Sequence, residues 1–239
     1  KNVLTRTFEE IPESGAEGTF YAEFRKTMIQ WKALPSLASH KTIDNINKMT
    51  EGLSPKEFKT FSKLVYFLDL QEETEIQKKK GYKEILLPNN ITPAEVDAVI
   101  EDIQKNNLTP KVKKAIAKRK KVWDNLKKQY IRANQHIGFD VENRFLRENY
   151  YRHQVIEYMD QDKRGLQKRD ATINTGRGWL KQRRGSTLAI NTDFLAVEHQ
   201  ALLQMQYDTY IAEYLGKIKD LYDIKPQLKI EAHELNKQR

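Results

Sequence analysis

The sequence of 239 residues contains no cysteine. A disulfide framework, a thiol nucleophile and a cysteine-ligated zinc or iron–sulfur site are therefore excluded, because each of them needs the sulfur atom. Long apolar runs are missing as well. The longest uncharged apolar stretches, such as residues 85–87, are far shorter than the roughly 20 residues of a membrane-spanning helix. These absences argue against a disulfide-rich secreted scaffold and against a membrane protein.

Signals for strands and for bound cofactors are also scarce. No stretch alternates apolar and polar residues for long, and no Asn-Gly or Asp-Gly pair marks a hairpin. Residues 82–87 are the one strand candidate, and without a partner they are expected to form an extended connector. The five histidines lie far apart without metal-ligand spacing, and no glycine-rich phosphate loop is present. The sequence therefore predicts no metal site and no cofactor.

Helix starts are the clearest positive signal. Three sites place a hydroxyl N-cap directly before a proline, namely Ser54-Pro55, Thr92-Pro93 and Thr109-Pro110. At the first two sites, Glu57 and Glu95 occupy the third helical position and complete a capping box. Apolar residues follow at helical spacing, which predicts amphipathic helices that pack on a core.

The predicted fold is all-α, with long helices packed as antiparallel helical hairpins or a bundle and an extended N-terminal arm. Long helices are expected over residues 55–79, 110–135, 140–160 and 193–219, after a helix at 17–34 that Pro35 ends. The predicted divisions are an arm at 1–16, an N-terminal helical region at 17–104 and a basic helical region at 105–239. One continuous helical domain is the alternative.

Positive charge is concentrated in the middle of the chain. The net charge is +9, from 42 Lys and Arg residues against 33 Asp and Glu residues. Residues 105–184 hold 22 of the basic and 8 of the acidic side chains. Such a block can attract nucleic-acid phosphates, an acidic partner or an anionic membrane surface, because Coulomb attraction does not distinguish them. A solvated helix surface is the alternative.

The stretch from Lys111 to Tyr130 combines an apolar stripe with a cationic surface. Its stripe comprises Val112, Ala115, Ile116, Val122, Trp123, Leu126 and Tyr130. The cations are Lys111, Lys113, Lys114, Lys118, Arg119, Lys120, Lys121, Lys127 and Lys128. Lysines bind phosphate as point charges and read no sequence, so we predict contacts to a nucleic-acid backbone. The candidates are Lys113, Lys114, Lys118, Lys120 and Lys121; a docking face for an acidic domain is the alternative.

A second basic motif lies at residues 176–186, with the sequence Gly-Arg-Gly-Trp-Leu-Lys-Gln-Arg-Arg-Gly-Ser. Glycine permits close approach of the backbone, and arginine pairs with phosphate in a bidentate manner. The predicted phosphate contacts here are Arg177, Lys181, Arg183 and Arg184. Trp179 either stacks on a base or anchors the segment in the core.

Aromatic and cationic side chains gather at residues 144–154. On the helix expected here, Arg147 and Tyr151 share a face. The residues predicted to line a pocket are Arg147, Tyr150, Tyr151, Arg152 and His153. A tyrosine beside His and Arg suits a nucleic-acid-acting enzyme with a tyrosine nucleophile, whereas aromatic residues at helical spacing are commonly core. No catalytic residue is assigned.

Three strings, Asn149–Val155, Leu180–Ser186 and Ile190–Leu195, resemble a pattern in large polyvalent proteins of phages and integrative elements. In those proteins similar segments lie between enzymatic modules such as helicases, methylases or proteases. The resemblance brings no catalytic residues. It implies a mobile-element protein that travels with DNA or acts beside it.

We therefore predict a non-catalytic helical module of a phage or mobile-element protein. It is expected to support assembly or domain positioning and to bind a nucleic-acid backbone through residues 105–184. The expected partners are DNA or RNA, bound without sequence preference, and other domains or virion proteins, with no membrane; a homo-oligomer is left open. The alternatives are the enzyme with a tyrosine nucleophile and a structural virion protein. The expected location is the virion or the bacterial cytoplasm, without secretion by a signal peptide.

Overall fold

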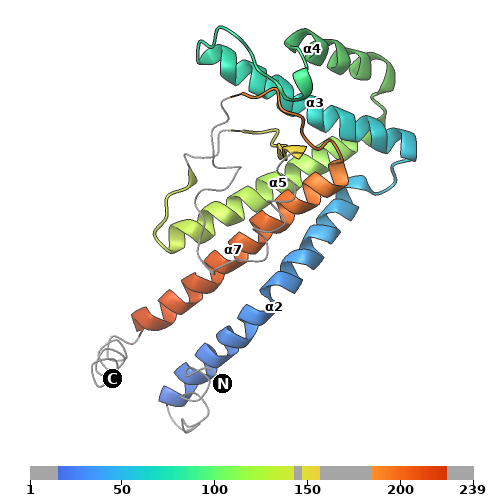
Figure 1. Ribbon diagram of the computed structural model, residues 1–239. Helices are drawn as coiled ribbons and strands as arrows, with labels where there is room; N and C mark the ends of the chain where they lie inside the picture. The colour runs from blue at the N-terminus through green and yellow to red at the C-terminus, as the bar shows by residue number, and fades with distance from the viewer. Residues whose placement is uncertain (1–15, 143–146, 157–184, 225–239) are drawn as a thin grey trace.

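The computed structural model describes residues 16–142, 147–156 and 185–224. In Figure 1 the long helices lie side by side, and the shorter ones lie at one end of them. The long helices are α2 (Ala16–Thr50), α5 (Pro110–His136) and α7 (Phe194–Ile224), and the others are α3 (Pro55–Lys79) and α4 (Pro93–Asp102). Within the described ranges, β pairing is limited to one isolated antiparallel bridge between Val155 and Ile190. The prediction of an all-α fold is confirmed.

Two short turns complete the α3–α4 end. A 3-10 turn at Pro88–Asn90 precedes α4, and a π-helical turn at Ile103–Asn107 follows it. Residues 82–87 form no helix and no strand, as expected of a connector. The predicted arm lies outside the described residues except for Ala16, where α2 begins.

Helix directions follow from contacts near the helix ends. The rings of Trp31, in the middle of α2, and Tyr214, in the last third of α7, lie 4.6 Å apart. Met49, at the end of α2, shares a core cluster with Leu202, near the start of α7, so the two helices are antiparallel. In contrast, α5 and α7 run in the same direction (Figure 1). Arg119 contacts Glu198 near their starts, and His136 contacts Asp220 near their ends.

The hydrophobic core is shared among the helices. One cluster of buried side chains joins α3, α4, α5 and the start of α7, with Phe61, Ile100, Val112 and Phe194 among its members. This cluster therefore contains residues from both sides of position 104, the predicted boundary between the N-terminal helical region and the basic one. A second cluster, which includes Met49, Trp123 and Leu202, joins α2, α5 and α7.

The predicted helix caps are present. Ser54 and Thr92 each accept a hydrogen bond from the backbone of the Glu three residues later, and that Glu side chain accepts from the cap backbone. Thr109 caps α5 and also donates its hydroxyl to Glu57 Oε1 at 2.9 Å. The starts of α3 and α5 are thereby joined.

Protonation of Glu57 should weaken this cap. Hydrogen bonds from the backbone and side chain of Ser54 hold the pKa of Glu57 below its ordinary value of 4.5. Because the folded-state pKa is lowered, the interaction stabilises the fold above pH 4.5 and is lost as the pH falls through the folded-state pKa. An NMR titration of the Glu57 carboxyl should give a lowered pKa that Ser54→Ala raises. A pKa that this replacement leaves unchanged would contradict the cap.

The first helix was predicted to end at Pro35, and this is wrong, because α2 continues to Thr50. A proline inside a helix costs about 3 kcal/mol through the lost hydrogen bond and the ring clash. Pro35 lies on the exposed side of α2, while Leu34 packs against Ile211 and Tyr214 of α7. Burial of a leucine or methionine stabilises by about 1.5–3 kcal/mol each, so Leu34 and Met49 together offset the proline.

The helix predicted at residues 140–160 is also wrong where the structure describes it. Residues 147–154 form no helix and bend at 148–149, and Val155 forms the isolated bridge to Ile190. The backbone N–H groups of Glu148 and Asn149 each donate to a carboxylate oxygen of Glu72 at 2.8 Å, and that of Tyr151 donates to Asp69 at 3.0 Å. These backbone amides therefore donate to carboxylates of α3, whereas in a helix they would donate to the carbonyl oxygens four residues earlier in the chain.

Candidate nucleic-acid interface

The solvent side of α5 is strongly basic. The helix carries ten Lys and Arg side chains and a single acidic one, Asp124. Its buried side contains Val112, Ala115, Trp123, Leu126 and Tyr130, as the apolar stripe predicts. On the opposite side Lys113, Lys114, Lys120 and Lys121 are exposed. Four of the five predicted phosphate-binding lysines on this helix thus point to solvent within about 12 Å of helix length.

Arg119 is not part of the cationic surface, and its assignment there was wrong. Its guanidinium is bidentate on Glu198 of α7, at 2.8 and 2.9 Å, and also donates to the carbonyl oxygen of Tyr150 at 2.6 Å. Trp123 Nε1 donates to the same Glu198 carboxylate at 2.7 Å. Both charged side chains are buried, so the pair holds α5, α7 and residue 150 together.

Lys118, the fifth predicted lysine, borders a hollow at the turn between α2 and α3. Its ammonium lies 3.2 Å from a carboxylate oxygen of Glu51. The hollow has a volume of about 360 Å³ and is called the Lys118 hollow below. It is lined by Met49, Glu51, Gly52, Lys111, Lys114, Ala115 and Lys118. Lys111, Lys114 and Lys118 therefore line the same cavity. Lys114 lies about one helical turn after Lys111, and Lys118 lies about two turns after it.

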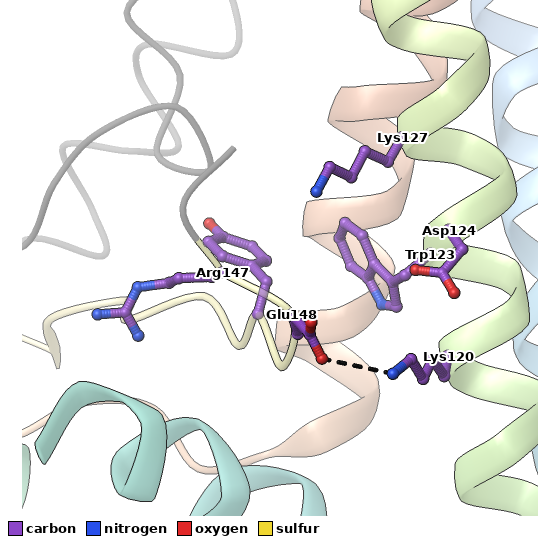
Figure 2. Close-up of a pocket in the computed structure, with 7 residues that line it drawn as sticks. Lys120, Trp123, Asp124, Lys127, Arg147 and Glu148 are labelled. Atoms are coloured by element: carbon purple, nitrogen blue, oxygen red, sulfur yellow. Dashed lines mark hydrogen bonds and ion pairs between the residues drawn. The ribbon is translucent and has the colours of Figure 1, made fainter. Parts of the chain in front are cut away.

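A second hollow, called the Trp123 hollow, lies on the other flank of α5 and measures about 240 Å³. It is lined by Lys120, Trp123, Asp124, Lys127, Arg147, Glu148 and Tyr150 (Figure 2). Glu148 spans it to reach Lys120 at 3.4 Å, and Figure 2 shows the Arg147 side chain pointing away from α5. Two carboxylates thus oppose the cations of this hollow.

The predicted pocket at residues 147–153 is divided by the structure. Arg147 and Tyr150 line the Trp123 hollow, whereas Tyr151, Arg152 and His153 do not.

These side chains mainly fasten the segment to the helices. Arg147 pairs with Asp69 at 3.3 Å and with Glu73, while His153 Nε2 lies 2.8 Å from Asp69 Oδ2. Arg152 donates to Gln204 Oε1 of α7 at 2.9 Å. Asp69 and Glu73 are buried on α3, so the Arg147 guanidinium beside them is held as a structural counter-charge.

Tyr151 lacks the environment of a nucleophile. Its ring is fully buried, and its hydroxyl donates to the backbone carbonyl of Asn191 at 3.3 Å. Burial raises the pKa of Tyr151 far above its ordinary value, with the charge of Glu198 adding to the effect. Both effects oppose formation of the phenolate that nucleophilic attack requires.

Comparisons with protein-family models, curated proteins and solved structures find no match to this chain. The resemblance to polyvalent mobile-element proteins therefore stays a prediction. In the described ranges no three metal-ligating side chains gather at one place, and no helix is long and apolar enough to cross a membrane. Arg177, Lys181, Arg183 and Arg184 lie outside the described residues, so their predicted phosphate contacts also stay predictions.

Several residues that organise the site were not predicted from the sequence. Glu51 and Glu148 pair with lysines of α5, and Glu198 and Asp69 hold buried cations. For α3 a signal was present. Its buried stripe continues at four-residue spacing through the polar positions Asp69, Glu73 and Gln77. Polar residues on a core-facing stripe indicate a buried hydrogen-bond network.

Proposed function

We propose that this chain is a non-catalytic helical module that binds the phosphate backbone of DNA or RNA through the solvent side of α5. The proposal rests on one observation, the excess of ten basic over one acidic side chain on a helix whose lysines lie mainly on its exposed side. Neutralising several phosphates from one helix releases condensed counterions, which favours binding at low salt.

Backbone binding without sequence recognition fits the type of cation that is exposed. Base-specific contacts commonly use arginine in a bidentate geometry, whereas lysine acts as a point charge. Arg119, Arg147 and Arg152 are engaged with acceptors inside the protein. The exposed charge of α5 comes mainly from lysines, so contacts to phosphates are favoured over contacts to bases.

A role in assembly or in positioning neighbouring domains belongs to the same proposal, as does the phage or mobile-element setting. These parts rest on the sequence resemblance. The burial of Tyr151 and the hydrogen bond of its hydroxyl argue against this residue as the nucleophile of the alternative enzyme.

Neutralising the lysines of α5 tests the proposal. The variant replaces Lys113, Lys114, Lys118, Lys120 and Lys121 with glutamine. The matched control replaces five exposed lysines elsewhere, namely Lys32, Lys41, Lys78, Lys79 and Lys83. Fluorescence anisotropy with labelled DNA and RNA of about 20 nucleotides, at about 50 mM salt, should show a loss of at least tenfold for the first variant and under about threefold for the control.

Two results would overturn the proposal. One is the absence of wild-type binding at this low salt. The other is an equal loss in both variants, because overall charge alone would then account for the affinity. Circular dichroism should show equal helix content for all three proteins, since the replaced side chains are exposed or half-exposed and glutamine is a good helix former.

A further inference from the structure

The two hollows on the flanks of α5 differ in their balance of charge. The Lys118 hollow contains three lysines and one carboxylate, that of Glu51. The Trp123 hollow contains two carboxylates, and its Arg147 is engaged by Asp69 and Glu73 of α3. An anion is therefore attracted more strongly to the Lys118 hollow.

The shape of the Lys118 hollow also fits a linear polyanion. Lys111, Lys114 and Lys118 lie on one side of two turns of α5, a rise of about 10.5 Å. That length equals the axial rise of about three nucleotides of one strand. Gly52 forms part of the opposite wall with no atom within 4 Å of the place where a Cβ would stand, so the backbone there is open to close approach.

Glu51 competes for this hollow in the free protein. Its side chain is 77% exposed, whereas that of Lys118 is 31% exposed. The carboxylate can therefore leave the ammonium and enter solvent at little cost, while Lys118 remains at the hollow. A phosphate that replaces Glu51 restores the counter-charge of Lys118.

We propose that the Lys118 hollow binds successive phosphates of one nucleic-acid strand and that Glu51 occupies it as a competing carboxylate when no nucleic acid is bound. This inference rests on the proposed function. It assigns the main contact to one flank of α5 and predicts that loss of one acidic side chain tightens binding.

The structure offers a matched control on the other flank. Glu148 pairs with Lys120 at 3.4 Å and is also 77% exposed, so Glu51→Gln and Glu148→Gln remove the same charge from similar ion pairs beside α5. Glu51→Gln should tighten binding of a DNA of about 20 base pairs two- to five-fold at about 50 mM salt, in line with the strength of an exposed ion pair. Glu148→Gln should change it by less than about 1.5-fold.

Two further variants locate the effect. In a Lys118→Gln background, Glu51→Gln should have no effect, because the two side chains act as a pair. Replacement of Lys111, Lys114 and Lys118 with glutamine should make the slope of log K against log salt shallower by about 2 to 3, since each phosphate contact contributes about 0.9.

The results separate the inference from the proposed function. Wild-type binding combined with no change in Glu51→Gln, or with an equal gain in Glu148→Gln, overturns the inference alone. Absence of wild-type binding overturns the proposed function and the inference with it. A gain confined to Glu51→Gln and dependent on Lys118 supports both.

Discussion

Replacement of Glu198 with alanine is expected to lower the free energy of unfolding by about 3–5 kcal/mol, the usual cost of leaving one partner of a buried ion pair without the other. Glu198 is 1% exposed and accepts hydrogen bonds from Arg119 and from Trp123 Nε1. Its loss leaves a buried guanidinium facing the space of the missing carboxylate. Urea denaturation followed by far-UV circular dichroism measures the change.

Two controls identify the cause. Glu75 is exposed on α3, and its replacement with alanine should change stability by less than about 0.5 kcal/mol. The double variant Arg119→Met, Glu198→Met removes both charges, and it should be more stable than Glu198→Ala because no unpaired charge remains. A Glu198→Ala protein as stable as the wild type would contradict the assignment of this pair as the link between α5 and α7.

Replacement of Asp69 with alanine should cost a similar amount, about 3–5 kcal/mol. Asp69 is fully buried and accepts from the backbone N–H of Tyr151 at 3.0 Å as well as from Arg147 and His153. Its removal leaves a buried amide without its acceptor and releases residues 147–153 from α3. Chemical denaturation gives the stability change, and hydrogen exchange at Tyr151 reports the local release.

Asp44 provides the comparison for this variant, because it is an exposed carboxylate on α2. Asp44→Ala should leave both stability and exchange near the wild-type values. Unchanged protection of the Tyr151 amide in Asp69→Ala would show that α3 does not hold the segment through this side chain.

Helix starts could be predicted from the sequence because a cap is a local structure. Ser54, Thr92 and Thr109 each bond to a backbone amide three residues away, so the residues that decide the geometry lie next to one another in the chain. The buried stripe of α5 was equally predictable, since helical periodicity alone decides which side chains face the core.

The non-helical segment at residues 147–155 could not be predicted in this way. Its aromatic and basic residues fit a helix locally, but its amides bond to Asp69 and Glu72, about 80 positions earlier in the chain. The continuation of α2 through Pro35 has a related cause, because the deciding contacts of Leu34 come from α7. Such long-range contacts overrule local propensity.

For the candidate site, helical periodicity places Arg119 on the buried side of α5, because it lies four residues after Ala115 and four before Trp123. Its partner Glu198 lies 79 positions later, so the ion pair itself depends on the tertiary fold. Glu51 and Glu148 come from distant parts of the chain, so their pairing with Lys118 and Lys120 depends on the tertiary fold.

Binding of a nucleic-acid backbone by α5, without recognition of its sequence, is the proposed function. It is tested most directly by measuring the affinity of the wild-type chain for two DNA duplexes of unrelated sequence between about 50 and 200 mM salt. We expect affinities equal within about threefold for the two sequences and a slope of log K against log salt between about −2.7 and −4.5 for both, from three to five phosphate contacts. Absence of binding at the lowest salt, or an affinity that does not depend on salt, would contradict it.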